Sequence, residues 1–239
     1  AVIAIGGGSP IDAGKSVAIL LANKGKCARD IYEFKFTPEK AVPIIAINLT
    51  HGTGTEVNRF AVVSVPEKEH KPAIAYDCIY PLFSIDDPAL MTKLPARQTI
   101  YVSVDAVNHV VEASTTLATN PLAILLAKET IRLVAKYLPM AIKNSDDLTA
   151  RYYLLYASLI AGTAFDNGLL HYTHALEHPL SGVKPEQPQR VLPVVGVHVK
   201  GDSTASLDLL NVLKGIESSY PTPATHSTMP VGLDRQSFR

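Results

Sequence analysis

The feature that most constrains the fold is a run of three glycines between an apolar segment and a segment that reads as a helix. Ala1–Ile5 is apolar and predicts a buried strand. Ser9 is a suitable helix N-cap, Pro10 suits the first helical position, and Asp12 occupies the position of a capping-box acid. The segment therefore predicts a strand, a tight glycine turn and a helix in direct succession.

Such a turn can bind an anion. Glycine lets the backbone approach a ligand closely, and the free amides and positive dipole end of the following helix attract negative charge. The spacing fits neither Gly-x-Gly-x-x-Gly nor the Walker pattern. The run predicts a phosphate-binding turn, with an ordinary glycine-rich turn between a strand and a helix as the alternative.

Composition excludes several classes of function. The chain has 239 residues, of which 47% are apolar, and it carries 22 basic and 22 acidic side chains. A balanced charge gives no field for nucleic acid, and the apolar runs are shorter than the roughly 18 residues of a spanning helix, so we expect neither a nucleic-acid nor a membrane partner. Cys27 and Cys78 are too few and too far apart for a disulfide framework or a Cys-x-x-Cys site. We expect a soluble, cytoplasmic protein.

Strand and helix patterns alternate in the first part of the chain. The expected elements are a helix over Pro10–Asn23, a strand buried on both faces over Val42–Asn48, a hairpin of Ala61–Val65 with Ala73–Tyr76, and a strand over Leu82–Ile85. Because the sequence begins inside a strand, we also expect that strands needed to complete the sheet precede Ala1.

Helical patterns replace strand patterns after Leu94. The expected helices run from Pro95 to about Ala113, from the Asn120-Pro121 cap to about Lys143, and from the Ser145-Asp146-Asp147 cap to about Ala164. The predicted fold class is thus α/β plus all-α. The expected units are an α/β domain over 1–94, a helical domain over 95–200 and a divergent tail over 201–239, whose turn-forming composition favours disorder.

Two segments of the helical part carry metal-ligand side chains. Asp105 and His109 are four residues apart, so both project from one helix face. His171, His174 and His178 would line one stripe of a second helix. Carboxylate and imidazole suit Zn(II), Fe(II), Mn(II) or Ni(II). The alternative is a hydrogen-bonded helix histidine beside a surface acid.

The segment after the second predicted strand suits a ligand-binding loop. Residues 49–57 are rich in hydroxyl and small side chains, which fit a loop over phosphates or ribose at the carboxyl edge of a parallel sheet. A polar turn that caps a helix is the alternative. Lys71, in a charged hairpin, either reaches a nucleotide or is solvated.

These motifs together resemble the iron-containing (metal-dependent, group III) alcohol dehydrogenase family. The resemblance covers about residues 1–188 and rests on four motifs in order: Gly6-Gly7-Gly8-Ser9-x-x-Asp12-x-x-Lys15, Thr50-x-Gly52-Thr53-Gly54-Thr55-Glu56-Val57, Asp105-x-x-x-His109 and His174-x-x-x-His178-Pro179-Leu180-Ser181-Gly182. It implies a dehydroquinate synthase-like architecture, in which a partial dinucleotide-binding domain precedes a helical metal-binding domain.

The resemblance also implies roles for individual residues. Gly7, Gly8 and Ser9 would bind the pyrophosphate of NAD or NADP, and Asp12 would support that turn. Thr50 and Thr53 would line the cofactor, and Lys71 would contact it. Asp105, His109 and His174 would bind a divalent metal, Fe(II) or Zn(II). His178 would lie near the nicotinamide and substrate as the catalytic residue, whereas His171 matches no motif position.

The sequence departs from the family pattern after about Pro188. The position of the fourth family ligand, a histidine followed by glycine, reads Gln189-Arg190, and Gln is a weaker donor while Arg opposes a cation. The expected function is nicotinamide-linked dehydrogenation of a small alcohol, with metal polarising the substrate oxygen, in a chain that also forms homo-oligomers. The alternatives are a non-catalytic remnant and a glycerol or polyol dehydrogenase, enzymes that carry the Gly-Thr-Gly-Thr-Glu-Val run less often.

Overall fold

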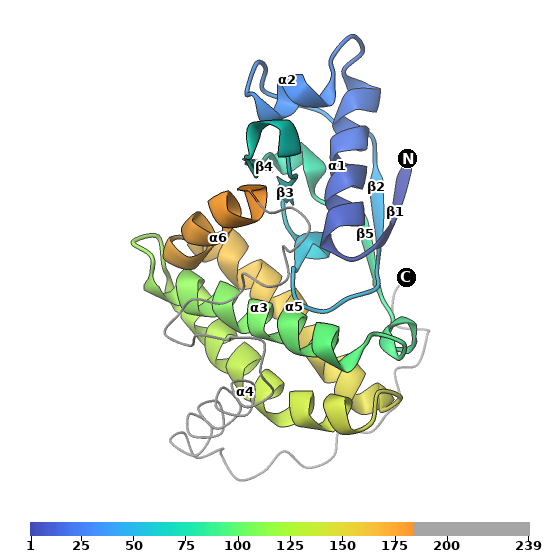
Figure 1. The fold of residues 1–239 in the computed structure, drawn as a ribbon, viewed down its shortest axis with the longest axis vertical. Helices are drawn as coiled ribbons and strands as arrows, with labels where there is room; N and C mark the ends of the chain where they lie inside the picture. Colours follow the sequence, from blue (N-terminus) through green and yellow to red (C-terminus); the bar gives the residue numbers. More distant parts are fainter. Residues whose placement is uncertain (184–239) are drawn as a thin grey trace, which may run out of the picture.

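A small α/β part leads into a set of long packed helices in the computed structural model, which describes residues 1–183 (Figure 1). The α/β part contains β1 (Val2–Gly6), α1 (Gly8–Ala22), α2 (Ala28–Tyr32), β2 (Ile44–Asn48), the short helix η1 (Thr55–Val57), β3 (Phe60–Val62), β4 (Ala73–Ala75) and β5 (Phe83–Asp86). The helical part contains α3 (Ala96–Thr115), α4 (Pro121–Lys143), α5 (Leu148–Gly168) and α6 (Tyr172–Val183). The predicted fold class is confirmed.

The carboxyl ends of three strands meet at one edge of the main sheet. The strand order is β1-β2-β5, and both pairs are parallel. Gly6 pairs with Asn48, and Asn48 pairs with Asp86, so the glycine turn and the loop after β2 leave the sheet side by side. Strands β3 and β4 form the predicted antiparallel hairpin.

Only one face of this sheet is covered by the described residues. Helix α1 packs on that face, where Gly14 lies so close that an added Cβ would come within 2.6 Å of the Ala4 Cβ. On the opposite face Ile3, Ile5 and Ile85 are exposed. The prediction that the second strand is buried on both faces is therefore wrong for this structure, because its side chains alternate between a covered and an open face.

Helix α1 begins earlier than the capping pattern indicates. Gly7 is the N-cap in an extended conformation, Gly8 is the first helical residue, and no side chain caps the helix. The predictions that Ser9 is the N-cap and that Pro10 is the first helical residue are wrong. Asp12 does not act as a capping-box acid either, because its carboxylate accepts hydrogen bonds from Thr55 and Val62.

Two of the predicted helix caps form as expected. The Asn120 side chain accepts a hydrogen bond from the Ala123 amide at the start of α4, and the Asp147 side chain accepts one from the Ala150 amide at the start of α5. Helices α3, α4 and α5 enclose the largest hydrophobic core. None of the described helices is long and apolar enough to cross a membrane.

Candidate metal centre and cofactor loop

The two glycines of the predicted anion turn lie against two threonines of the loop after β2. A Cβ added to Gly7 would come within 2.8 Å of the Thr50 Oγ1, and one added to Gly8 within 2.8 Å of the Thr53 Cγ2. Any larger side chain at either glycine would push the two loops apart. The structure thus brings Gly7, Gly8, Thr50 and Thr53 together at the amino end of α1, where the first helical amides lack partners within the helix.

Two buried side chains of opposite charge, Asp12 and Lys15, support this turn, and both contact the Thr55 hydroxyl. The Asp12 carboxylate accepts hydrogen bonds from Thr55 Oγ1 at 2.6 Å and from the Val62 amide at 3.0 Å. Lys15 Nζ donates to the carbonyl oxygens of Thr55, Asn58 and Phe60 at 2.6–2.8 Å. Burial raises the pKa of Asp12 to about 6 against the opposing effect of Lys15, and burial lowers the pKa of Lys15 to about 8 against that of Asp12. These hydrogen bonds attach α1 to residues 55–62, which follow the Thr50 and Thr53 loop.

The loop after β2 that carries Thr50 and Thr53, called the threonine loop below, also makes hydrogen bonds to the helical part. The Gly52 amide donates to Ser158 Oγ on α5 at 2.6 Å, and His51 Nε2 lies 3.1 Å from Ser103 Oγ on α3. Gly54 has a φ of +61° and packs on Gly162, where an added Cβ would come within 2.6 Å of the Gly54 carbonyl oxygen. Backbone of the loop therefore touches backbone of α5, and glycine is needed on both sides.

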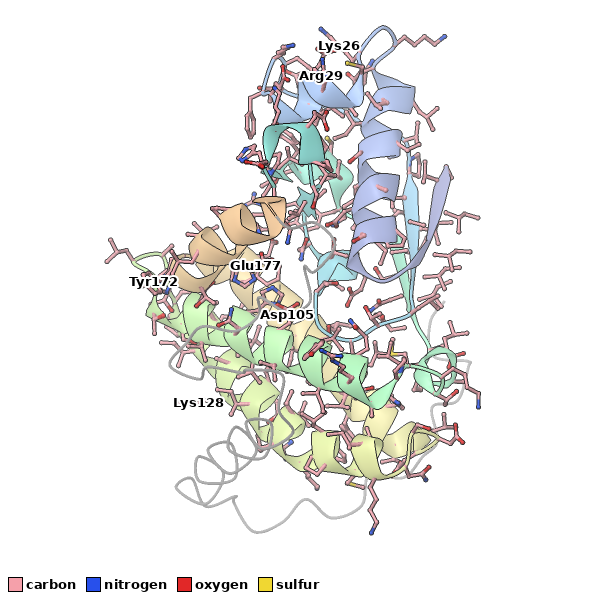
Figure 2. The ribbon with its side chains drawn as sticks, in the orientation of Figure 1. Lys26, Arg29, Asp105, Lys128, Tyr172 and Glu177 are labelled. Atoms are coloured by element: carbon pink, nitrogen blue, oxygen red, sulfur yellow. The ribbon has the colours of Figure 1, made fainter. Side chains whose placement is uncertain are left out.

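Three side chains converge where α3 and α6 face the α/β part. His109 Nε2 lies 3.6 Å and His174 Nε2 lies 3.9 Å from the same Asp105 carboxylate oxygen. One ligand atom from each residue fits within a group 4.8 Å across. All three residues are largely buried, so the alternative that Asp105 is a surface acid is wrong. Figure 2 shows Asp105 on α3 directed toward this region.

A hydrogen bond orients the His109 imidazole so that Nε2 faces the Asp105 carboxylate. His109 Nδ1 lies 3.1 Å from the Gly52 carbonyl oxygen, which can only accept, so Nδ1 carries the proton and Nε2 keeps its lone pair. Burial lowers the pKa of His109 well below its ordinary value, and burial raises that of Asp105 to about 7. Two imidazole nitrogens and one carboxylate oxygen in a buried position fit a divalent transition metal.

Glu112 is a member of this site that the sequence analysis did not identify. It accepts hydrogen bonds from His174 Nδ1 at 2.7 Å and from the backbone amides of His171, Thr173 and His174. Burial acts to raise its pKa, but the hydrogen bonds from His174 and Thr173 outweigh it and lower the pKa to about 2. Its spacing could have revealed it, because residues 105, 109 and 112 follow the i, i+4, i+7 pattern of one helix face.

Lys71 and His178 lie beside the group of Asp105, His109 and His174, at the contact of α6 with the β3–β4 hairpin. Lys71 Nζ binds both carboxylate oxygens of Glu177 at 2.9 and 3.1 Å, so the interpretation of Lys71 as a solvated side chain is wrong. The His178 ring packs edge-on against His174 with the ring centroids 6.0 Å apart. Figure 2 shows Glu177 on α6, and, in addition to burial, its charge acts to raise the pKa of Asp105. Glu177 is a second residue that the sequence analysis missed, because its partner lies 106 positions away.

His171 does not belong to the predicted helical stripe. Helix α6 begins after it, at Tyr172, and the Nε2 atom of His171 lies 2.8 Å from Thr115 Oγ1. Gln189 and Arg190, at the expected fourth ligand position, lie outside the described residues, as does the predicted tail over 201–239.

Glu56 is buried in η1, directly after the loop that carries Thr50 and Thr53. Neither of its carboxylate oxygens has a hydrogen-bond partner among the described residues. Burial, with repulsion from Asp86, raises its pKa from 4.5 to about 8. The folded protein therefore keeps a proton on Glu56 that the unfolded chain releases above about pH 4.5. By linkage, the free energy of unfolding falls as the pH rises from about 4.5 through 8.

We expect Glu56→Gln to remove this part of the pH dependence, because an amide stays neutral at every pH. At pH 8 the variant should be more stable than the wild type by on the order of 3 kcal/mol, and at pH 5 the two should be nearly equal. Urea unfolding at both pH values measures the difference. Glu67→Gln, at an exposed glutamate, is the control, and an unchanged pH slope in Glu56→Gln would contradict the expectation.

Comparison with known protein families places both parts of the chain. Residues 1–88 match the model of the iron-containing alcohol dehydrogenase, and residues 99–184 match that of the C-terminal part of the Fe-containing alcohol dehydrogenase family. The long-chain primary alcohol dehydrogenase AdhA of Thermoanaerobacter ethanolicus is 68% identical over 186 residues, which cover 78% of this chain and 47% of the relative. The chain thus spans about half the length of that relative.

Solved structures of similar fold agree with these matches. The NADH-dependent butanol dehydrogenase A of Thermotoga maritima has a TM-score of 0.75 and 27% identity, covering 92% of this chain and 62% of its own. The sulfoacetaldehyde reductase of Bifidobacterium kashiwanohense in complex with NAD+ has a TM-score of 0.75 and 27% identity, covering 90% and 62%. Both similarities extend over the α/β part and the helical part together.

Proposed function

Because this chain belongs to the iron-containing alcohol dehydrogenase family, we propose that it acts in the nicotinamide-linked interconversion of an alcohol and an aldehyde or ketone. The observation that carries the proposal is the hydrogen bond between His109 Nδ1 and the Gly52 carbonyl oxygen, which joins the metal cluster to the threonine loop. This contact supports the proposal because it links the proposed metal ligands to the loop that carries Thr50 and Thr53. The family is enzymatic, and its named members include alcohol dehydrogenases.

We assign the metal to Asp105, His109 and His174, with Fe(II) as the first expectation and Zn(II) as the alternative. The donor set supports this assignment, because both Nε2 atoms face the Asp105 carboxylate while both Nδ1 atoms are engaged elsewhere. A divalent metal bound there would act as a Lewis acid on the oxygen of an alcohol or carbonyl group.

We assign NAD or NADP to the turn at the amino end of α1. Gly7, Gly8 and Ser9 would present backbone amides to the pyrophosphate, while Thr50 and Thr53 would line the cofactor. Asp12 would hold the turn from below through Thr55 and Val62. Lys71 would contact the cofactor, and its bond to Glu177 restricts where its ammonium group can lie.

We assign His178 to the reacting end of the site. Burial, and after it the positive charge of Lys71, lowers the pKa of His178 to about 4. The imidazole is therefore neutral near pH 7 and can accept a proton. A cavity of about 340 Å³ adjoins it between α6 and the hairpin, lined in part by Phe34, Lys71, Pro72 and Pro179. Its mixed apolar and polar wall supports a small organic substrate.

The wider assignments follow from the same features. We propose a cytoplasmic location, in keeping with two cysteines that form no disulfide. The balanced charge of the chain supports a small-molecule partner over nucleic acid. The domain limits at residues 94 and 200 and the assembly of the chain into homo-oligomers stay predictions.

The test is metal content measured together with turnover. The chain is purified without oxygen, loaded with Fe(II) or Zn(II), and assayed for reduction of NAD and NADP by ethanol, butanol, propanediol and glycerol. One metal per chain with turnover supports the proposal. Metal binding without turnover would favour the non-catalytic alternative, and a preference for glycerol would favour the polyol dehydrogenase alternative.

A further inference from the structure

The carboxylate of Glu112 contacts several groups at and just before the amino end of α6. Its side chain is buried, with 2% exposed, and it lies on α3 below the amino end of α6. It accepts from three backbone amides, those of His171, Thr173 and His174, and from the His174 ring. One side chain therefore touches both the backbone and the imidazole of a predicted metal ligand.

We propose that Glu112 is the positioning residue of the metal centre: it selects the His174 tautomer that directs Nε2 toward Asp105 and anchors the first turn of α6. The inference rests on the proposed metal site and deepens it. Glu112 itself is not one of the three clustered residues, and its carboxylate contacts the Nδ1 side of the His174 ring.

The tautomer follows from hydrogen-bond chemistry. A carboxylate only accepts, so the 2.7 Å contact requires the proton on His174 Nδ1, and in the neutral ring, the form that binds a metal, the lone pair is then on Nε2. That Nε2 atom is the one 3.9 Å from the Asp105 oxygen. A carboxylate bonded to the remote nitrogen of a metal-bound histidine also raises the basicity of the ligand.

Glu112 anchors the first turn of α6 because the backbone amides there need hydrogen-bond acceptors. The first amides of any helix lack partners within it, and an anion there also gains from the helix dipole. Glu112 supplies the acceptor for Thr173 and His174 from a different helix. The ligand-bearing turn of α6 is thus fixed to α3, the helix that carries Asp105 and His109.

The two histidines of the site differ in what holds their Nδ1 atoms, so a substitution at Glu112 can test one of them alone. His109 Nδ1 is held by a backbone carbonyl, that of Gly52, which no substitution removes. His174 Nδ1 depends on side chains instead, with Glu112 Oε2 at 2.7 Å and the Asn108 amide nitrogen more distant at 3.4 Å. Replacement of Glu112 should therefore disturb one of the two imidazoles and leave the other oriented.

The experiment compares Glu112→Ala and Glu112→Gln with Glu129→Gln, a control glutamate on α4 that pairs with Arg132 on its own helix. We expect Glu112→Ala to weaken Zn(II) binding roughly 10–100-fold in competition with a chromophoric chelator. Glu112→Gln, which keeps an acceptor oxygen, should lie between the alanine variant and the wild type. Glu129→Gln should bind Zn(II) as the wild type does.

Two measurements on the metal-free chain separate this inference from the proposed function. Nitrogen-15 NMR should show His174 as the Nδ1–H tautomer in the wild type and as a mixture in Glu112→Ala. Hydrogen exchange at the Thr173 and His174 amides should accelerate in the alanine variant alone. An unchanged tautomer and unchanged exchange would overturn the inference, as would a lower melting temperature with wild-type Zn(II) affinity. Failure of the wild type to bind Zn(II) would instead refute the proposed function.

Discussion

The Asp105→Asn variant is expected to lose divalent metal and, with it, the proposed activity. Asp105 supplies the oxygen that both Nε2 atoms face, and an amide oxygen is a neutral and weaker ligand. The loss in metal affinity should exceed the roughly 10–100-fold typical of partners that only orient a ligand. Equilibrium dialysis with metal analysis measures affinity, and reduction of the nicotinamide measures turnover.

The same substitution should act in the opposite direction on the metal-free protein. Burial raises the pKa of Asp105 to about 7, so at pH 8 the folded chain holds a buried carboxylate at a cost. Asparagine removes that cost, and the metal-free variant should melt at a higher temperature than the metal-free wild type. The wild type, but not the variant, should then gain stability on addition of Zn(II).

His171→Ala is the matched control for Asp105→Asn. His171 lies a few residues from His174 but contacts Thr115 outside the cluster, so its removal should leave metal affinity unchanged. Equal metal loss in both variants would show that the helical part had been disturbed as a whole. Wild-type metal content in Asp105→Asn would show that the assigned ligand set is wrong.

Local patterns predicted the parts of the site that depend on neighbours in sequence. The glycine run predicted the turn before α1, and the four-residue spacing of Asp105 and His109 placed both side chains on one face of α3. Caps at Asn120 and Asp147 were predictable because each side chain bonds an amide three residues ahead. These are short-range effects of backbone geometry.

Contacts between distant segments were not predictable in this way. Lys71 reads as a solvated lysine within its charged hairpin, and only the packing of α6 supplies Glu177 as its partner. The amino end of α6, fixed by Glu112, excludes His171 from the stripe that the histidine spacing predicts. In both cases a tertiary contact overrides the local pattern.

The largest effect on stability is expected for Lys15→Met. Lys15 is fully buried on α1, and its ammonium group donates to three backbone carbonyl oxygens of residues 55–60. Methionine fills the space but leaves these acceptors without a donor and removes the nearby positive charge that opposes the cost of burying Asp12. A buried acceptor left without its donor costs about 1–3 kcal/mol, so the loss of several is a large share of the roughly 5–15 kcal/mol that holds a domain folded.

Urea unfolding followed by circular dichroism measures this loss, with Lys24→Met as the control because Lys24 is an exposed lysine just after the same helix. If the cost comes from uncompensated charge, Asp12→Asn should rescue part of it, and the double variant should be more stable than the sum of the single effects predicts. Strict additivity would mean that Lys15 acts through its backbone acceptors alone. A Lys15→Met chain as stable as the Lys24→Met chain would show that the bonds between α1 and the threonine loop contribute nothing, which contradicts the structural basis for a preformed cofactor turn.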